Sequence, residues 1–165
     1  MRLCILPPRK SEFYEAILIS SFFKGDIMDL NRFESLIGIE KVNKIRNLSI
    51  LVVGLGGVGG YVVESLTRCG INNITLVDFD VIKSSNINRQ IIATRRNNNH
   101  YKTKEWKKRI KSINKNAKVN IINIKINESN IDLLFSESYD YIIDACDTTI
   151  VKIKLIKECF KRDIT

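Results

Sequence analysis

The sequence predicts an α/β domain with a mainly parallel sheet and helices on both faces. An apolar, β-branched run over residues 48–53 meets Gly54, Gly56 and Gly59 in G-x-G-x-x-G spacing. A helical run follows over residues 58–68, and a second apolar run over residues 74–77 ends at Asp78. This order of strand, glycine turn, helix, strand and acid is typical of a nucleotide-binding βαβ unit in a Rossmann-like fold.

The three glycines and the acid have separate physical roles in such a unit. Gly54 takes the tight turn after the strand, Gly56 lets backbone N–H groups approach phosphate, and Gly59 lets the helix pack against its strand. The start of the helix favours negative charge. Asp78 can accept hydrogen bonds from a ribose hydroxyl. We therefore predict a nucleotide site, while glycines retained only for packing are the alternative.

The remaining elements alternate between helix and strand, as a parallel sheet requires. Before the glycine turn, one or two short helices broken near Gly38 are expected over residues 29–46. Gly70 is expected to end the helix 58–68. The later elements are a helix over 102–114, a strand over 119–126, a short helix over 128–135, a strand over 139–144 and a helix over 149–162.

A long polar connection over residues 80–99 separates the second strand from the next helix. Long ordered loops in small domains are often functional. The segment 85–90, Ser-Asn-Ile-Asn-Arg-Gln, supplies amide and guanidinium groups that can hold phosphate.

Length and composition predict one cytoplasmic domain. A chain of 165 residues is long enough to bury a core. Its apolar runs are all much shorter than the roughly 20 residues that span a bilayer. The four cysteines, at positions 4, 69, 146 and 159, form no C-x-x-C pair and no disulfide framework, so we expect reduced, mostly buried thiols.

The net charge of +9 is concentrated between residues 95 and 125, where Glu105 is the single acid. Such clustering fits a polyanionic partner such as RNA. A chain rich in lysine, asparagine and isoleucine could also carry lysines as a compositional bias. These two interpretations stay open at this point.

We divide the chain into an N-terminal extension, residues 1–27, and an α/β domain, residues 28–165. If translation begins at Met28, the extension is an over-called start. The chain ends where the strand after the helix 149–162 would begin, so we expect a domain truncated at its C-terminus.

Five motifs together resemble those of the ATP-dependent adenylating enzymes, which include the ubiquitin-activating enzymes and the activators of sulfur-carrier proteins. The motifs are G-L-G-G-V-G (54–59), V-D-F-D (77–80), S-N-I-N-R-Q (85–90), the lysine at position 102 and D-A-C-D (144–147). Within this superfamily the chain is similar to the tRNA threonylcarbamoyladenosine dehydratases. The likeness covers residues 28–165, which correspond to the N-terminal part of such enzymes.

The resemblance implies an ATP site. Gly57 and the neighbouring glycines would lie against the phosphates, and Asp78 would hold the ribose. Arg89 and Lys102 would bind the phosphate chain, and the residues in support would be Asn86 and Gln90.

It also implies a metal ion and a dimer. Asp147 would help to hold Mg²⁺, although it could instead cap the next helix, and Asp144 is expected to be a structural acid at the end of a strand. In relatives an arginine at the position of Arg32 reaches the other protomer of a homodimer; the alternative for Arg32 is a surface charge.

The implied activity is ATP-dependent adenylation of a carboxylate on tRNA, followed by cyclisation with loss of AMP. Asp147-Thr148 stands where carrier-protein activators usually have Asp-Asn, which favours the tRNA substrate. The alternatives are activation of the C-terminus of a ubiquitin-like sulfur carrier, an NAD-binding module, and a truncated, non-catalytic remnant. Since relatives carry further strands, we expect this chain alone to bind ATP weakly and not to complete catalysis.

Overall fold

Four parallel strands form the centre of the computed structural model, which describes residues 28–164. The proposed N-terminal extension lies outside the described residues. The strands are β1 (Ser49–Val53), β2 (Asn73–Val77), β3 (Lys118–Ile122) and β4 (Tyr141–Asp144), and their order in the sheet is β3-β2-β1-β4. All three neighbouring pairs are parallel, so the predicted parallel sheet is confirmed.

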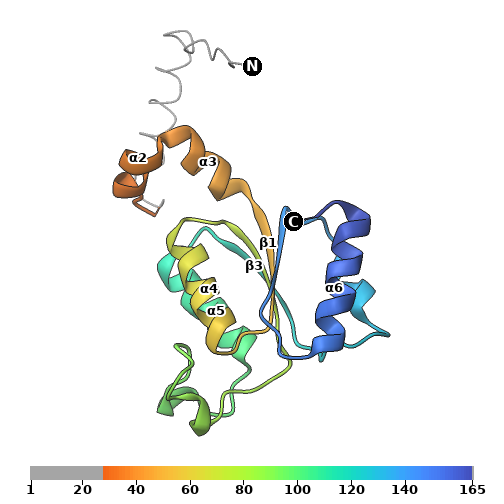
Figure 1. Cartoon of the computed structure of the whole chain (residues 1–165). Coiled ribbons are helices and arrows are strands. Elements are labelled where there is room, and N and C mark those ends of the chain that lie inside the picture. Colours follow the sequence, from red (N-terminus) through yellow and green to blue (C-terminus); the bar gives the residue numbers. More distant parts are fainter. Residues whose placement is uncertain (1–27, 165) are drawn as a thin grey trace.

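Helices cover both faces of this sheet, as the sequence predicts. Helices α4 (Gly57–Arg68) and α5 (Lys102–Ile113) lie on one face, and α6 (Thr149–Arg162) lies on the other (Figure 1). Successive residues of a strand point to opposite faces. Accordingly Val52 packs with the cluster under α4 and α5, whereas Val53 packs with the cluster under α6.

The larger of the two apolar clusters contains Trp106 and Ile110, which are fully buried on the inner side of α5. Ile113, which the helical spacing places on the same side, is only partly buried. On the other face a short 3-10 helix, η3 (Ile131–Phe135), packs beside α6. Each face of the sheet therefore has its own core.

Two short helices precede the sheet, α2 (Asn31–Ile37) and α3 (Ile39–Asn47), and the break between them falls at Gly38 as predicted. Gly38 has a φ of 88°, which glycine adopts without a steric penalty. No residue of α2 is buried, and Leu36 is 79% exposed.

Two boundaries differ from the sequence-based expectation by three residues or more. Strand β3 ends at Ile122 rather than at residue 126, and Ile124 and Ile126 line a cavity instead. The helix expected over 128–135 begins only at Ile131. The Asn127 side chain accepts hydrogen bonds from the backbone N–H groups of Ser129 and Asn130, and this local turn replaces the first helical turn.

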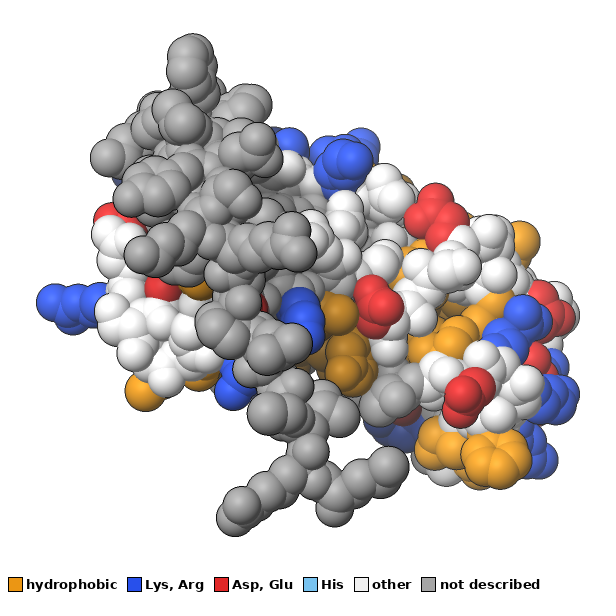
Figure 2. All heavy atoms as spheres, turned by 90° about the horizontal axis from the view of Figure 1, so that it is seen from above, with side chains coloured by type: hydrophobic (Ala, Val, Ile, Leu, Met, Phe, Trp, Pro, Cys, Tyr) orange, Lys and Arg blue, Asp and Glu red, His pale blue; other side chains and the backbone are white. Residues whose placement is uncertain are grey.

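Hydrophobic side chains also reach the surface on the side of the molecule where α6 lies, as the view from above shows (Figure 2). They include Ile153, Ile156 and Phe160 of α6. Within residues 28–164, each helix is too short or too polar to cross a membrane.

Candidate nucleotide site

A cavity of about 560 Å³ opens at the carboxyl ends of β1, β2 and β4. In open parallel sheets this edge, where neighbouring connections diverge, is the usual position of a ligand site. The cavity brings together most of the residues that the sequence nominated: Gly54, Gly56, Gly57, Asp78, Asn86, Arg89, Gln90, Lys102 and Asp147.

The glycine turn is shaped by close backbone contacts. Gly54 has a φ of 92°, and a Cβ atom there would lie 2.7 Å from the carbonyl oxygen of Ala145. A Cβ atom at Gly59 would lie 1.9 Å from the carbonyl oxygen of Gly54, so Gly59 serves helix packing and does not line the cavity. A Cβ atom at Gly56 would meet nothing within 4 Å, which leaves its backbone open to the cavity.

Asp78, at the end of β2, holds the turn in place. Its Oδ2 accepts a hydrogen bond of 2.7 Å from the backbone N–H of Leu55, and its Oδ1 accepts one of 2.8 Å from the N–H of Asp80. The side chain is buried. Since each carboxylate oxygen can accept two hydrogen bonds, binding of a ribose hydroxyl is compatible with these contacts and stays a prediction.

Lys102, the first residue of α5, brings a buried positive charge to the cavity. The residue is 4% exposed, and its Nζ lies 2.9 Å from Asp80 Oδ2 and 3.8 Å from Asp78 Oδ2. A buried ammonium group needs such partners. Asp80 is a residue of the site that sequence reasoning did not nominate, although the second acid of V-D-F-D could have indicated it.

The loop 84–90 contributes two buried amide side chains. Asn86 ends the short 3-10 helix η1 (Ser84–Asn86), and its Oδ1 accepts a hydrogen bond of 3.0 Å from the backbone N–H of Lys83. Asn86 therefore shapes the loop. Gln90 is 6% exposed, and its Oε1 has no hydrogen-bond partner. A buried acceptor in a cavity wall fits a bound ligand that donates a hydrogen bond.

Arg89 lies on the same loop and is exposed. One of its terminal nitrogens donates to the carbonyl oxygen of Ser85 at 2.9 Å and to Asn88 Oδ1 at 3.0 Å. A guanidinium group has five N–H donors, so others remain for a phosphate in the cavity.

The two acids after β4 differ in their surroundings. Asp144 accepts a hydrogen bond from the N–H of Cys146 at 3.0 Å and pairs with Lys152 Nζ at 3.1 Å, as expected for a structural acid. Asp147 is exposed and lines the cavity. The residue that caps α6 is Thr148, and no side-chain capping bond is formed, so the helix-cap alternative for Asp147 finds no support.

The residues 28–164 hold no group of three or more His, Cys, Asp or Glu side chains that could bind a metal ion by themselves. Mg²⁺ is commonly held by one or two carboxylates together with water and substrate phosphates. The single exposed carboxylate of Asp147 fits this arrangement, and its role as a magnesium ligand stays a prediction.

Cys146, which sequence reasoning did not assign to the site, also lines the cavity. Burial, with a contribution from the hydrogen bond to Asp144, raises the pKa of its thiol to about 11. The thiol is therefore neutral at physiological pH and unsuited to act as a nucleophile.

Arg32 does not line the cavity. It lies on α2 and is exposed. Both the predicted contact with a second protomer and a simple surface charge agree with this placement.

Known proteins resemble this chain in sequence. Residues 29–165 match the model of the ThiF family. The tRNA threonylcarbamoyladenosine dehydratase of Bacillus subtilis is 39% identical over 134 residues, which are 81% of this chain and 53% of the relative. The enzyme of the same name from Haemophilus influenzae is 40% identical over 125 residues, which are 76% of this chain and 48% of the relative.

A solved structure leads to the same family. The E. coli tRNA N6-threonylcarbamoyladenosine dehydratase in complex with ATP superposes with a TM-score of 0.77 at 36% identity, over 79% of this chain and 54% of that one. This chain thus spans about half the length of the curated relatives it matches. With the family model covering nearly all the described residues, the chain belongs to the ThiF family.

Proposed function

We propose that this chain binds ATP with Mg²⁺ and activates a carboxylate as an acyl-adenylate, with the threonylcarbamoyl group of a modified tRNA as the substrate. The observation that carries the proposal is the convergence of Arg89, Lys102 and Asp147 on the cavity that the glycine turn bounds. An anionic ligand there would meet two cationic side chains and the start of α4.

The cavity supplies what the adenylation step requires. A carboxylate oxygen attacks the α-phosphorus of ATP, and the bond from that phosphorus to pyrophosphate breaks. Negative charge accumulates on the phosphate oxygens during this step, and donors fixed beforehand lower its energy. Lys102 is held beside Asp80. Arg89, on the loop 84–90, has N–H donors that its bonds to Ser85 and Asn88 do not use.

Asp147 would hold Mg²⁺, which when bound neutralises charge on the pyrophosphate that leaves. Asp78 would orient the ribose, while Gln90 Oε1 would receive a donor from the nucleotide. Arg89, Lys102 and the Mg²⁺ held by Asp147 would thus act on the phosphates, and Asp78 and Gln90 would position the rest of the nucleotide.

After adenylation, a nucleophile within the same modified nucleoside attacks the acyl carbon and AMP leaves. The nucleoside becomes cyclic and loses the elements of one water molecule. The nucleotide is converted from ATP to AMP and pyrophosphate. The names of the relatives support tRNA as the carrier of this carboxylate.

Titration calorimetry with ATP and Mg²⁺ tests the binding step. Lys102→Ala and Asp147→Ala are expected to abolish or strongly weaken binding. Lys104→Ala and Asp132→Ala are matched controls, because each removes the same charge from an exposed position that does not line the cavity. Equal ATP binding in all five proteins would refute the site, and binding of NAD instead of ATP would favour the NAD-binding alternative.

The substrate is tested with tRNA that carries threonylcarbamoyladenosine. If tRNA is the substrate, prolonged incubation with saturating ATP releases AMP and reduces the mass of the modified nucleoside by one water, at a rate far below that of a full-length relative because this chain spans about half of that length. AMP release only with a ubiquitin-like carrier protein would favour the carrier-protein alternative. ATP binding without AMP release from either substrate would favour the non-catalytic remnant.

A further inference from the structure

The solvent-exposed side of α5 carries an unusual concentration of positive charge. Five positions of this helix are exposed. Four of them are lysines, namely Lys104, Lys107, Lys108 and Lys111, and the fifth is Ser112. Their spacing of i, i+3, i+4 and i+7 places the four lysines in one row on the helix. We call these four residues the α5 basic face. At 1.5 Å per residue the row is about 10 Å long.

The nearby acid does not cancel this charge. Glu105 is turned aside, with a side chain that is 13% exposed, and it contacts Lys108 at 2.7 Å and His100 at 3.1 Å. Among the residues that the structure describes, Lys108 is the one member of the α5 basic face with an ion pair. Three of the four ammonium groups are therefore not neutralised by a carboxylate of the described chain.

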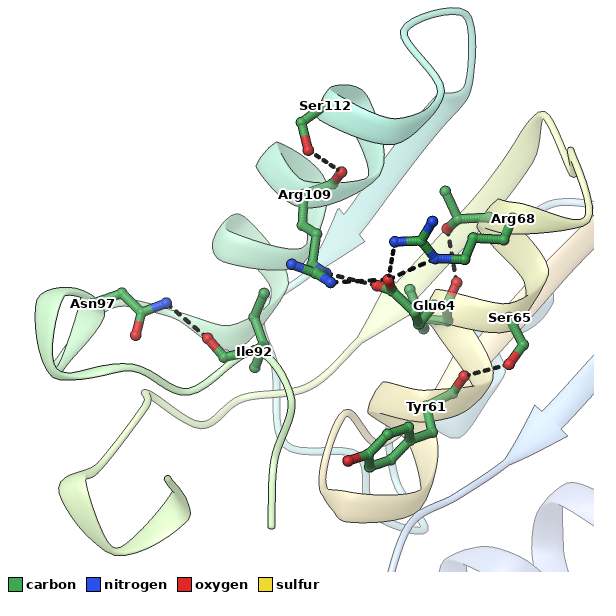
Figure 3. Close-up of polar contacts among 10 residues, drawn as sticks. Tyr61, Glu64, Ser65, Arg68, Ile92, Asn97, Arg109 and Ser112 are labelled. Atoms are coloured by element: carbon green, nitrogen blue, oxygen red, sulfur yellow. Dashed lines mark hydrogen bonds and ion pairs between the residues drawn. The ribbon is translucent and has the colours of Figure 1, made fainter. Parts of the chain in front are cut away.

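Neighbouring elements extend the positive surface. The 3-10 helix η2 (Arg95–Asn97) brings two exposed arginines beside the start of α5. Asn97 is buried and fixes this helix, since its Nδ2 donates to the carbonyl oxygen of Ile92 at 2.8 Å and to Glu105 Oε2 at 3.4 Å. Figure 3 shows Asn97 beside α5, with its bond to Ile92.

The one arginine of α5, Arg109, makes contacts within the protein. Figure 3 shows Arg109 reaching from α5 to Glu64 on α4, where it forms hydrogen bonds of 2.6 and 2.9 Å. Arg68 of α4 pairs with the same carboxylate. The charge of Arg109, which faces α4, is thus matched by an acid, whereas three of the four charges of the α5 basic face have no such match among the described residues.

Compositional bias alone does not explain this contrast. The exposed positions of α6 mix lysine and arginine with Ile150, Ile153, Ile156 and Phe160. Those of α3 include Glu40 and asparagine as well as lysine. Of these three helices, α5 is the one in which lysine occupies nearly every exposed position.

The surface fits RNA better than a membrane. A helix that binds a membrane surface places large apolar residues next to its basic ones. On α5 the large apolar residues Trp106 and Ile110 are fully buried in the core, and Ile113 is partly buried. The exposed aromatic residue nearest the row in sequence is Tyr101, which Lys104 Nζ approaches to 5.3 Å from the ring centre. An exposed aromatic ring among cations is suited to stacking on an unpaired base.

We infer that the α5 basic face binds the phosphate backbone of RNA. Lys102 opens the same helix inside the cavity, and Lys104 stands two residues further on. The row therefore starts at the same end of α5 as the cavity that would adenylate the carboxylate of the modified base. The identity of this RNA as tRNA rests on the proposed function, while the binding surface stands on the charge pattern alone.

The test is fluorescence anisotropy of a labelled tRNA transcript titrated with the full chain, without ATP, at salt concentrations of about 50 and 200 mM. The variant is Lys104→Gln, Lys107→Gln, Lys108→Gln and Lys111→Gln together. The control replaces four exposed lysines elsewhere: Lys41→Gln, Lys44→Gln, Lys157→Gln and Lys161→Gln. Each set removes four charges, and each contains one lysine that pairs with a glutamate three residues away.

The α5 variant is expected to lose most of its salt dependence. If all four lysines contact phosphate, the ratio of affinities at the two salt concentrations shrinks by about 50- to 150-fold, while the control changes little. Equal Kd values for wild type and the α5 variant would overturn the inference. An equal loss in the control would also overturn it, since net charge would then explain the binding.

Two further outcomes separate this inference from its alternatives. Binding to vesicles that contain phosphatidylserine, without binding to tRNA, would overturn it in favour of a membrane surface. RNA binding that requires the four lysines in a chain that fails to bind ATP would support the inference and refute the proposed function. Circular dichroism of both variants checks that they are folded.

Discussion

Glu64 offers the sharpest test of how the two helices on one face of the sheet are held together. It lies on α4, is 8% exposed, and accepts hydrogen bonds from Arg109 Nε at 2.6 Å and Nη2 at 2.9 Å. Glu64→Gln keeps the shape of the side chain but removes its charge. Arg109, which is 36% exposed, then loses its ionic partner.

The expected loss of stability follows from these contacts. Hydrogen bonds to a charged group contribute about 1.5–3 kcal/mol when partly buried. Arg68 pairs with the same carboxylate but is 59% exposed, so its contribution is small. We expect Glu64→Gln to lower the free energy of unfolding by about 2 kcal/mol, and urea unfolding at pH 7 measures it.

The same pair predicts the pH dependence. Hydrogen bonding to Arg109 lowers the pKa of Glu64 below its ordinary value of 4.5. The folded state therefore binds this proton less tightly than the unfolded state, and the stabilisation is complete above the ordinary pKa. It is lost as the pH falls through the lowered pKa, so the difference between wild type and Glu64→Gln should shrink in acid.

Two results would refute this reasoning. One is an unchanged urea midpoint for Glu64→Gln at pH 7. The other is a double-mutant cycle with Arg109→Gln in which the two effects add without coupling. Asp132→Asn, an exposed acid for which the structure shows no ion pair among residues 28–164, serves as the control and should leave the midpoint unchanged.

Three more predictions concern the core and the cavity. Gly59→Ala should prevent stable folding, because its Cβ would overlap the Gly54 carbonyl oxygen at 1.9 Å, while Gly56→Ala should fold normally; circular dichroism distinguishes the two. Cys146 should react with iodoacetamide far more slowly than a free cysteine peptide at pH 8, because a pKa of about 11 leaves roughly one thiol in a thousand ionised. The rate of this reaction should still rise above pH 10, and mass spectrometry follows the labelling. Trp106→Ala should cost about 3–5 kcal/mol in urea unfolding, since the ring is fully buried between helix and sheet; a loss below 1 kcal/mol would contradict this.

Local spacing was sufficient to predict much of the fold. The glycine turn, the breaks at Gly38 and Gly70, the bounds of α6 and the placement of Asp78 at a strand end all depend on short-range sequence patterns. Such patterns work because positive φ angles, helix ends and apolar periodicity are decided within a few residues. The polar segment 85–90 indicated Arg89, the resemblance added Lys102 and Asp147, and the cavity brings these three together.

Other features could not be predicted from spacing, because they depend on how distant segments meet. The end of β3 at Ile122, the turn at Asn127, the pairing of Lys102 with Asp80 and the bridge from Glu64 to Arg109 are examples. The sequence by itself determined the glycine turn and its place between a strand and a helix. Only the tertiary structure decided which distant side chains share the cavity and which lysines share one exposed row, because strand register and helix packing set the distances between positions far apart in the chain.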